Sequence, residues 1–180
     1  MLQIVEHSSS SYGPRTFHNA TLSHLTVRFA VDFNTAGEKL TERASGGGIR
    51  LLDVPLPCEA LDPARALYAR LKRLDAEVLN IAGNGIYSMM EKGGLDQAQV
   101  NQMVYDVIKL CHKHYPITII RSGGQTGADL AGGVAGYKLG IPTIMTFPKG
   151  FRQRDVNKQD ANHTEEEIRE QVIQQSACLA

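Results

Sequence analysis

A glycine-rich segment between an apolar run and a helical pattern constrains the fold of this chain more than any other feature. The segment Ser122–Asp129 reads SGGQTGAD, follows the β-branched run Ile117–Ile120 and precedes the small-residue pattern Leu130–Leu139. This order predicts a strand, a tight turn and a helix N-terminus. A helix N-terminus carries unpaired backbone N–H groups and about half a positive charge, and glycines let the backbone approach a ligand closely. We therefore predict an anion site, typically for phosphate or carboxylate.

The spacing of these glycines argues against two common nucleotide-binding motifs. The chain has no Gly-x-x-x-x-Gly-Lys-Ser/Thr, which disfavours a P-loop nucleotidase. The spacing in Gly124–Gly127 also differs from the dinucleotide fingerprint, which disfavours a standard NAD dehydrogenase. An ordinary strand-to-helix turn with Thr126 as the N-cap is the structural alternative, but a turn alone needs one glycine rather than three.

Composition and charge narrow the class of protein. The 180 residues are enough for one domain with a sizeable core. The 19 basic and 19 acidic residues balance, so no basic excess indicates a nucleic-acid partner. No apolar run approaches the roughly 20 residues of a membrane span, and Met1–Glu6 lacks the features of a secretory signal. Cys58, Cys111 and Cys178 are odd in number and widely spaced, which predicts reduced thiols in a cytoplasmic protein. The histidines lack ligand spacing, so we predict no metal site.

Strand-like and helix-like segments alternate along the chain. The expected strands are Leu25–Phe33, Ile49–Val54, Val78–Ala82, Ile117–Arg121 and Ile141–Phe147, and the expected helices are Thr35–Ala44, one starting at Asp62-Pro63, one capped by Asp96, Asp129–Leu139, and one from Thr164 to about Gln175. This alternation predicts a single α/β, Rossmann-like domain with a mainly parallel sheet of about five strands and helices on both faces. We assign residues 1–24 to an N-terminal arm, flexible or packed as an irregular lead-in, 25–176 to the ligand-binding domain, and 177–180 to a C-terminal tail.

Polar or glycine-rich segments follow four of the expected strands. They are Asp32–Thr35, Gly83–Gly85, Ser122–Gly127 and Pro148–Gly150. Because ligands bind beyond the carboxyl ends of parallel strands, we expect these segments to converge on one site. The candidate ligand-binding residues are Ser122, Gly123, Gly124, Gln125, Thr126, Gly127, Asp129, Lys149, Gly150, Arg154, Asn84, Asp32 and Asn34.

The candidates divide into phosphate-binding and acidic groups. Backbone N–H groups of residues 125–128 would donate to a phosphate, and Lys149 would add a compact positive charge. A carboxylate repels phosphate, so we expect Asp129 to face the sugar side of a ligand. If the protein is an enzyme, Asp129 and Glu38 are the candidate catalytic acids or bases. The structural alternative for Glu38 is a capping box with Thr35.

The motif Ser122–Asp129, followed by Leu139–Pro142 and Pro148–Gly150, resembles the molybdenum-carrier family. That family belongs to the Rossmann-like SLOG superfamily, which includes the lysine-decarboxylase-like LOG proteins and the DNA-processing DprA proteins. The resemblance implies binding of a nucleotide-derived or pterin-phosphate ligand, and some members of the superfamily cleave the ribose–base bond. The chain lacks the Pro-Gly-Gly-x-Gly-Thr-x-x-Glu of the LOG enzymes, which disfavours their type of hydrolysis.

Three functions stay open at this point. The first is binding, as carrier, sensor or sequestering protein, of a phosphorylated nucleotide-derived or pterin-type small molecule through the glycine-rich strand-loop-helix. The alternative is a hydrolase of the N-glycosidic or phosphate bond of a nucleotide, and the third is an interaction protein with a vestigial site. No cofactor is firmly implied beyond a molybdopterin-type or nucleotide ligand. We expect no membrane partner, and a homodimer is the default expectation for the assembly.

Overall fold

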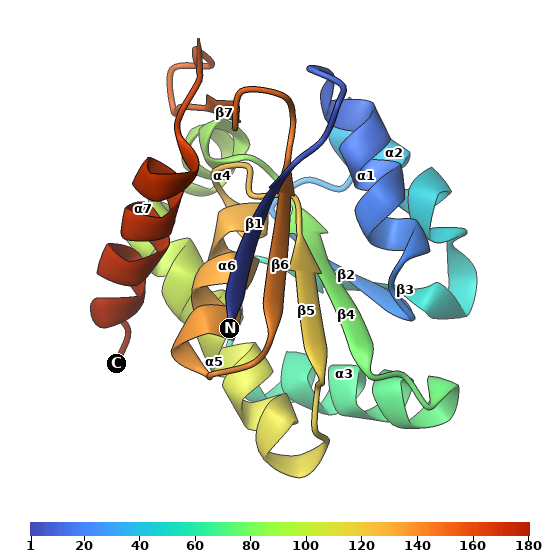
Figure 1. Ribbon diagram of the computed structural model, residues 1–180. Coiled ribbons are helices and arrows are strands. Elements are labelled where there is room, and N and C mark those ends of the chain that lie inside the picture. Colours follow the sequence, from blue (N-terminus) through green and yellow to red (C-terminus); the bar gives the residue numbers. More distant parts are fainter.

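The computed structural model describes residues 1–180 and is built around one six-stranded sheet (Figure 1). Its strands are β1 (Leu2–Glu6), β2 (Leu25–Ala30), β3 (Leu51–Pro55), β4 (Val78–Gly83), β5 (Ile119–Ser122) and β6 (Thr143–Phe147), and a separate antiparallel pair is formed by β7 (Gln153–Arg154) and β8 (Asp160–Ala161). The helices are α1 (Tyr12–Thr21), α2 (Ala36–Ser45), the 3-10 helix η1 (Gly48–Arg50), α3 (Leu61–Leu74), α4 (Ile86–Gly93), α5 (Gln97–His114), α6 (Ala128–Lys138) and α7 (Glu165–Ala177).

The sheet has the strand order β1-β6-β5-β4-β2-β3, and every neighbouring pair is parallel. The chain runs outward from β2 to β3 and then returns to β4 on the other side of β2. The connections therefore diverge between β2 and β4, which is the switch point where open parallel sheets form a ligand crevice at their carboxyl edge. This arrangement confirms the expected single α/β domain and adds a sixth strand.

Helices cover both faces of the sheet (Figure 1). Helices α1 and α2 pack against each other on one face, whereas α5 packs against α3 and α6, and α6 against α7, on the other. Helix α6 lies unusually close to the sheet because glycines face it. A Cβ at Gly132 would lie 2.7 Å from Ile81 Cβ, and one at Gly133 would lie 2.3 Å from Met145 Sδ. This close packing fixes the N-terminus of α6 directly beyond β5.

The expected N-terminal arm is instead part of the folded domain. Leu2 and Ile4 are buried in the main hydrophobic core, and β1 pairs with β6 at the edge of the sheet. Helix α1 follows after Ser11, and its Pro14 lies in the first turn, where a missing N–H breaks no helical hydrogen bond. Helix α1 therefore carries side chains to the carboxyl edge of the sheet, which is where the ligand site is expected.

Other boundaries differ from the sequence prediction in smaller ways. Helix α4 and the β7–β8 pair were not expected. Helix α3 starts at Leu61, one residue before the expected start. Asp62 therefore lies in the first turn and not at the N-cap, and the helix dipole stabilises a carboxylate in that turn too. The predicted caps Asp96 and Thr164 are confirmed, each within a capping box. No helix has an apolar stretch of the length needed to cross a membrane.

Candidate functional site

A cleft of about 610 Å³ opens at the carboxyl ends of β4 and β5, beside the switch point. Its walls come from α1, α2, α4, the glycine-rich turn and the β7–β8 segment. Six residues assigned from the sequence line this cleft: Glu38, Asn84, Gly123, Gln125, Asp129 and Arg154. The remaining assigned residues, Ser122, Gly124, Thr126, Gly127, Lys149, Gly150, Asp32 and Asn34, are not among its lining residues.

The backbone donors of the glycine-rich turn are already used by the protein. Gly127 N donates to Gln97 Oε1 over 2.6 Å, and Ala128 N donates to Asn84 O over 3.1 Å. Thr126 N donates to Gln125 Oε1 over 3.1 Å. Thr126 does not cap the helix either, because Gly127 holds the N-cap position and the Thr126 hydroxyl donates to the carbonyl of Arg154. The predicted phosphate cradle of free N–H groups is therefore not formed.

The three glycines are required by contacts inside the protein. A Cβ at Gly123 would lie 1.4 Å from Arg15 Nη1 and 2.3 Å from Asp129 Oδ2. Gly124 has a φ of +69° and packs on the ring of Phe147, where a Cβ would come within 2.1 Å. Gly127 has a φ of +93°, and a Cβ there would lie 2.3 Å from a backbone oxygen. The absence of side chains at these three glycines thus leaves room for the Phe147 ring, for a neighbouring backbone, and for the ion pair of Arg15 and Asp129.

That ion pair joins Asp129 to Arg15. Arg15 Nη1 lies 2.9 Å from Asp129 Oδ2, and both side chains are at least nine-tenths buried. Burial raises the pKa of Asp129, and the Arg15 charge together with the backbone N–H groups of Gln125 and Gly83 opposes that rise. Asp129 itself therefore occupies the position where the N-terminus of α6 favours an anion.

Asn84 connects the two strands at the switch point. Its Oδ1 accepts hydrogen bonds of 3.0 Å from the N–H groups of Val31 and Asp32. Its Nδ2 donates to the carbonyl of Asp32 over 3.0 Å and to Glu38 Oε1 over 3.1 Å. All four hydrogen-bonding positions of the amide are satisfied within the protein. Asn84 thus lines the cleft but serves to join β2, β4 and α2.

Glu38 lines the cleft and is only 2% exposed to solvent. Its Oε2 is buried and accepts no hydrogen bond. Burial raises the pKa of Glu38 to about 7, with Arg28 opposing the rise and the charge of Asp129 adding to it. The expected capping box is only half formed, since Thr35 Oγ1 accepts from Glu38 N while the Glu38 carboxyl turns toward Asn84.

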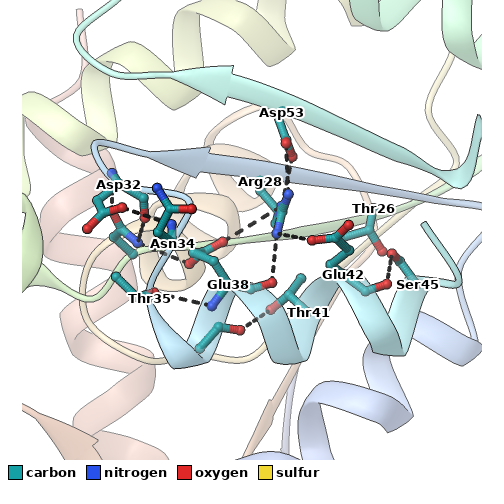
Figure 2. A network of polar contacts seen from close by, with 12 residues as sticks. Thr26, Arg28, Asp32, Asn34, Thr35, Glu38, Thr41, Glu42, Ser45 and Asp53 are labelled. Atoms are coloured by element: carbon teal, nitrogen blue, oxygen red, sulfur yellow. Dashed lines mark hydrogen bonds and ion pairs between the residues drawn. The ribbon is translucent and has the colours of Figure 1, made fainter. Parts of the chain in front are cut away.

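Arg28 directs its hydrogen bonds to Asp53 and to a backbone carbonyl, so its charge offsets that of the Glu38 carboxylate only in part (Figure 2). Its Nε and Nη2 each donate to the Asp53 carboxylate over 2.7 Å, and its Nη1 donates to the carbonyl of Glu38 over 2.7 Å. Arg28 Nε lies 3.8 Å from Glu38 Oε2, beyond hydrogen-bond distance.

The Asp32 carboxylate, assigned to the site from the sequence, makes other contacts. It accepts a hydrogen bond from Asn34 N over 2.8 Å and pairs with Lys92.

Sequence reasoning missed several residues that line the cleft, among them Tyr12 and Arg15 of α1. Arg15 Nε is buried and has no hydrogen-bond partner. Two guanidinium groups lie near the Tyr12 ring, with Arg15 Cζ 5.6 Å and Arg154 Cζ 5.4 Å from its centre. The available signal was Ser11 followed by Pro14, which is compatible with a helix start but stands within a serine-rich stretch that indicates a loop.

Lys149, predicted to bind phosphate, lies outside the cleft. Its side chain is exposed and its N–H donates to the carbonyl of Ser9 over 2.9 Å. Arg154 does reach the cleft, where its Nε is held 2.8 Å from Asp160 Oδ1. The basic residues that line the cleft are therefore Arg15, Lys92, Arg154 and Lys158, and none of them belongs to the segment Pro148–Gly150.

Three buried side-chain atoms of residues that line the cleft have no hydrogen-bond partner. They are one donor, Arg15 Nε, and two acceptors, Asn19 Oδ1 and Glu38 Oε2. Buried polar atoms are normally paired in folded proteins. A molecule that presents an acceptor to Arg15 and a donor to Glu38 would complete both.

Comparisons with known proteins assign no family to the chain. The chain has a Rossmann-like α/β fold. A scan against models of protein families gives no match to it, and a search of curated proteins gives none either.

Proposed function

We propose that the cleft binds a phosphorylated nucleotide-derived or pterin-type small molecule, and that the protein acts as its carrier, sensor or sequestering partner. The observation that carries this proposal is a set of three unpartnered buried atoms, Arg15 Nε, Asn19 Oδ1 and Glu38 Oε2, in residues that line the cleft at the switch point of a parallel sheet. Phosphate oxygens are acceptors that suit a guanidinium. A ribose hydroxyl, or the amino edge of a purine or pterin ring, is a donor that suits a carboxylate.

The remaining walls of the cleft match the other parts of such a ligand. Tyr12 and Tyr87 supply aromatic surface for a flat ring. Arg154 adds positive charge beside Tyr12. The phosphate is then held by side chains from α1 and the β7–β8 segment, because the N–H groups of the glycine-rich turn already have partners.

The resemblance of Ser122–Asp129 to the molybdenum-carrier family of the SLOG superfamily supports the same class of ligand. A phosphorylated pterin fits the donor set, because its amino-substituted ring offers N–H donors to Glu38 and its phosphate offers acceptors to Arg15. The three cysteines are free, which agrees with a protein of the reducing cytoplasm.

Hydrolysis of an N-glycosidic bond is the second candidate, and the raised pKa of Glu38, about 7, favours it. A general acid works best when its pKa lies near the operating pH. Protonated Glu38 would donate its proton to the departing base nitrogen as the carbon–nitrogen bond breaks. Water would add to the sugar carbon, and its proton would return to the Glu38 carboxylate.

Calorimetric titration with nucleoside phosphates and a pterin phosphate tests the binding proposal. We expect at least one of them to bind, and we expect Arg154→Gln to weaken its binding about tenfold, the effect of a lost charged hydrogen bond. Lys149→Ala, outside the cleft, serves as the matched control and should bind like the wild type. Chromatography of the incubated ligand separates the two candidates, because free base that is released by the wild type and not by Glu38→Gln identifies a hydrolase.

A further inference from the structure

A cluster of basic side chains lies on the sheet face that carries α1, outside the cleft. His7 follows β1, His18 belongs to α1, and Arg121 belongs to β5. The side chain of Ile120 contacts Gly136 of α6, so its neighbour Arg121 projects from the opposite face of the sheet. In the parallel register Arg121 aligns with Ile144 of β6, and Ile144 aligns with Gln3 of β1.

The three basic groups act on one another. The ring centres of His7 and His18 lie 6.1 Å apart in an edge-to-face arrangement. Partial burial lowers the pKa of His18, and the charges that add to this shift come from Arg121 and His7, both basic. No acidic group contributes to the shift. The cluster therefore gathers positive potential that the protein does not offset at His18.

Two atoms on this face lack the partners that buried groups normally have. Arg121 Nε is buried without a hydrogen bond, and Arg121 takes part in no ion pair. Thr146 is 2% exposed and its Oγ1 also has no partner. Thr146 aligns with Val5 of β1, two residues before His7, so it projects from the same face as the cluster.

We propose that His7, His18, Arg121 and Thr146 form a second binding site, which takes a phosphate group. Phosphate oxygens accept hydrogen bonds from guanidinium groups, imidazole N–H groups and hydroxyl groups. The cleft takes Tyr12, Arg15 and Asn19 from α1, whereas His18 is exposed and does not line the cleft, so the two sites use different sides of this helix. Inorganic phosphate and a phosphate monoester share the chemistry that the cluster recognises.

Histidine ring signals in NMR spectra report on this site directly. We expect titration with inorganic phosphate at pH 6.5 and constant ionic strength to shift the ring signals of His7 and His18 with saturation. Arg121→Met keeps the apolar stem and should weaken this binding about tenfold, since it removes a charged hydrogen bond. His18→Asn, on the exposed face of α1, should weaken it in the same direction, and it guards against a misfolded Arg121 variant. The exposed His114, changed to Gln, is the matched control and should leave the titration unchanged.

Parallel titrations with glycerol phosphate and with acetate identify the source and the class of anion. Tighter binding of glycerol phosphate than of inorganic phosphate indicates a monoester as the natural ligand, and the reverse indicates free phosphate; either supports the site. Absence of saturable shifts, wild-type affinity in both Arg121→Met and His18→Asn, or acetate binding as tight as phosphate would overturn the proposal. An empty cleft would leave these histidine shifts in place, so the two proposals fail separately.

Discussion

Asn84 Nδ2 donates to Glu38 Oε1 over 3.1 Å, and this bond ties the end of β4 to α2 at the switch point, where the strand connections diverge between β2 and β4. The same amide accepts from two N–H groups beyond β2. The Asn84 side chain therefore joins the ends of β2 and β4 and also fixes the orientation of the Glu38 carboxyl group.

Removing this bridge should destabilise the fold. Asn84→Ala leaves two N–H groups, a carbonyl and Glu38 Oε1 without their partner, and a buried unpaired group costs about 1–3 kcal/mol. We expect the free energy of unfolding, measured by urea denaturation, to fall by about 3 kcal/mol or more. Asn157→Ala, at an exposed position, is the control. A loss below about 1 kcal/mol for Asn84→Ala would contradict the bridging role.

The raised pKa of Glu38, about 7, predicts a pH dependence of stability. The folded state binds this proton more tightly than the unfolded chain, whose glutamate pKa is near 4.5, so the contribution is complete below that pH. Stability is then lost as the pH rises through 7. The expected loss is about 3 kcal/mol for this difference in pKa.

Urea denaturation of Glu38→Gln between pH 4 and pH 8.5 checks this expectation. The variant keeps an acceptor for Asn84 and carries no titrating group, so its stability relative to the wild type should increase across the range. Glu42→Gln changes a more exposed carboxylate of the same helix and is the matched control. Parallel pH profiles for the wild type and Glu38→Gln would show that Glu38 does not titrate there.

The glycine-rich turn should tolerate substitution poorly for reasons of packing. Gly124→Ala places a methyl group against the Phe147 ring and forces a left-handed backbone on alanine. Overpacking and the backbone penalty together should cost about 2–5 kcal/mol. Gly94 has a similar φ of +62° but nothing within 4 Å of a Cβ, so Gly94→Ala should cost only about 1–2 kcal/mol. Equal thermal shifts for the two variants would refute the packing explanation.

The Arg15–Asp129 pair should show strong coupling. Asp129→Leu leaves a buried guanidinium unpaired and should cost about 3–5 kcal/mol of stability. The double variant with Arg15→Met removes both charges, and it should recover much of that loss because no unpaired charge remains. A double-mutant cycle measured by urea denaturation supplies the coupling energy. Additive effects of the two substitutions would mean that the pair is not coupled.

The strands of the sheet were predicted well from the sequence, because each buried parallel strand corresponds to a short local run of apolar residues. β2 and β6 lie within the ranges expected for them, and β4 extends one residue beyond its expected range, to Gly83. The pattern of Asp96 and Thr164 located two helix starts. These features depend on residues close together in the chain. The first 24 residues were mistaken for an arm because a five-residue edge strand and a serine-rich connection give weak local signals.

The candidate site was harder to predict because its partners are distant in sequence. Three glycines in a turn indicate close approach by some group, but the pattern does not say which group. Here the group against Gly123 is Arg15, whose pairing with Asp129 depends on the whole fold. The burial of Glu38 likewise follows from the meeting of β2, α2 and β4, which no local pattern reveals.

Native mass spectrometry of gently purified protein, incubated with the nucleoside phosphates and the pterin phosphate and then denatured to release bound molecules, tests the central claim most directly. The account predicts a complex of one phosphorylated small molecule with the wild-type chain, and strong loss of that complex in Arg154→Gln but not in Lys149→Ala. Absence of any such complex, or equal retention by the wild type and Arg154→Gln, would contradict a ligand site in the cleft beside Glu38 and Arg15.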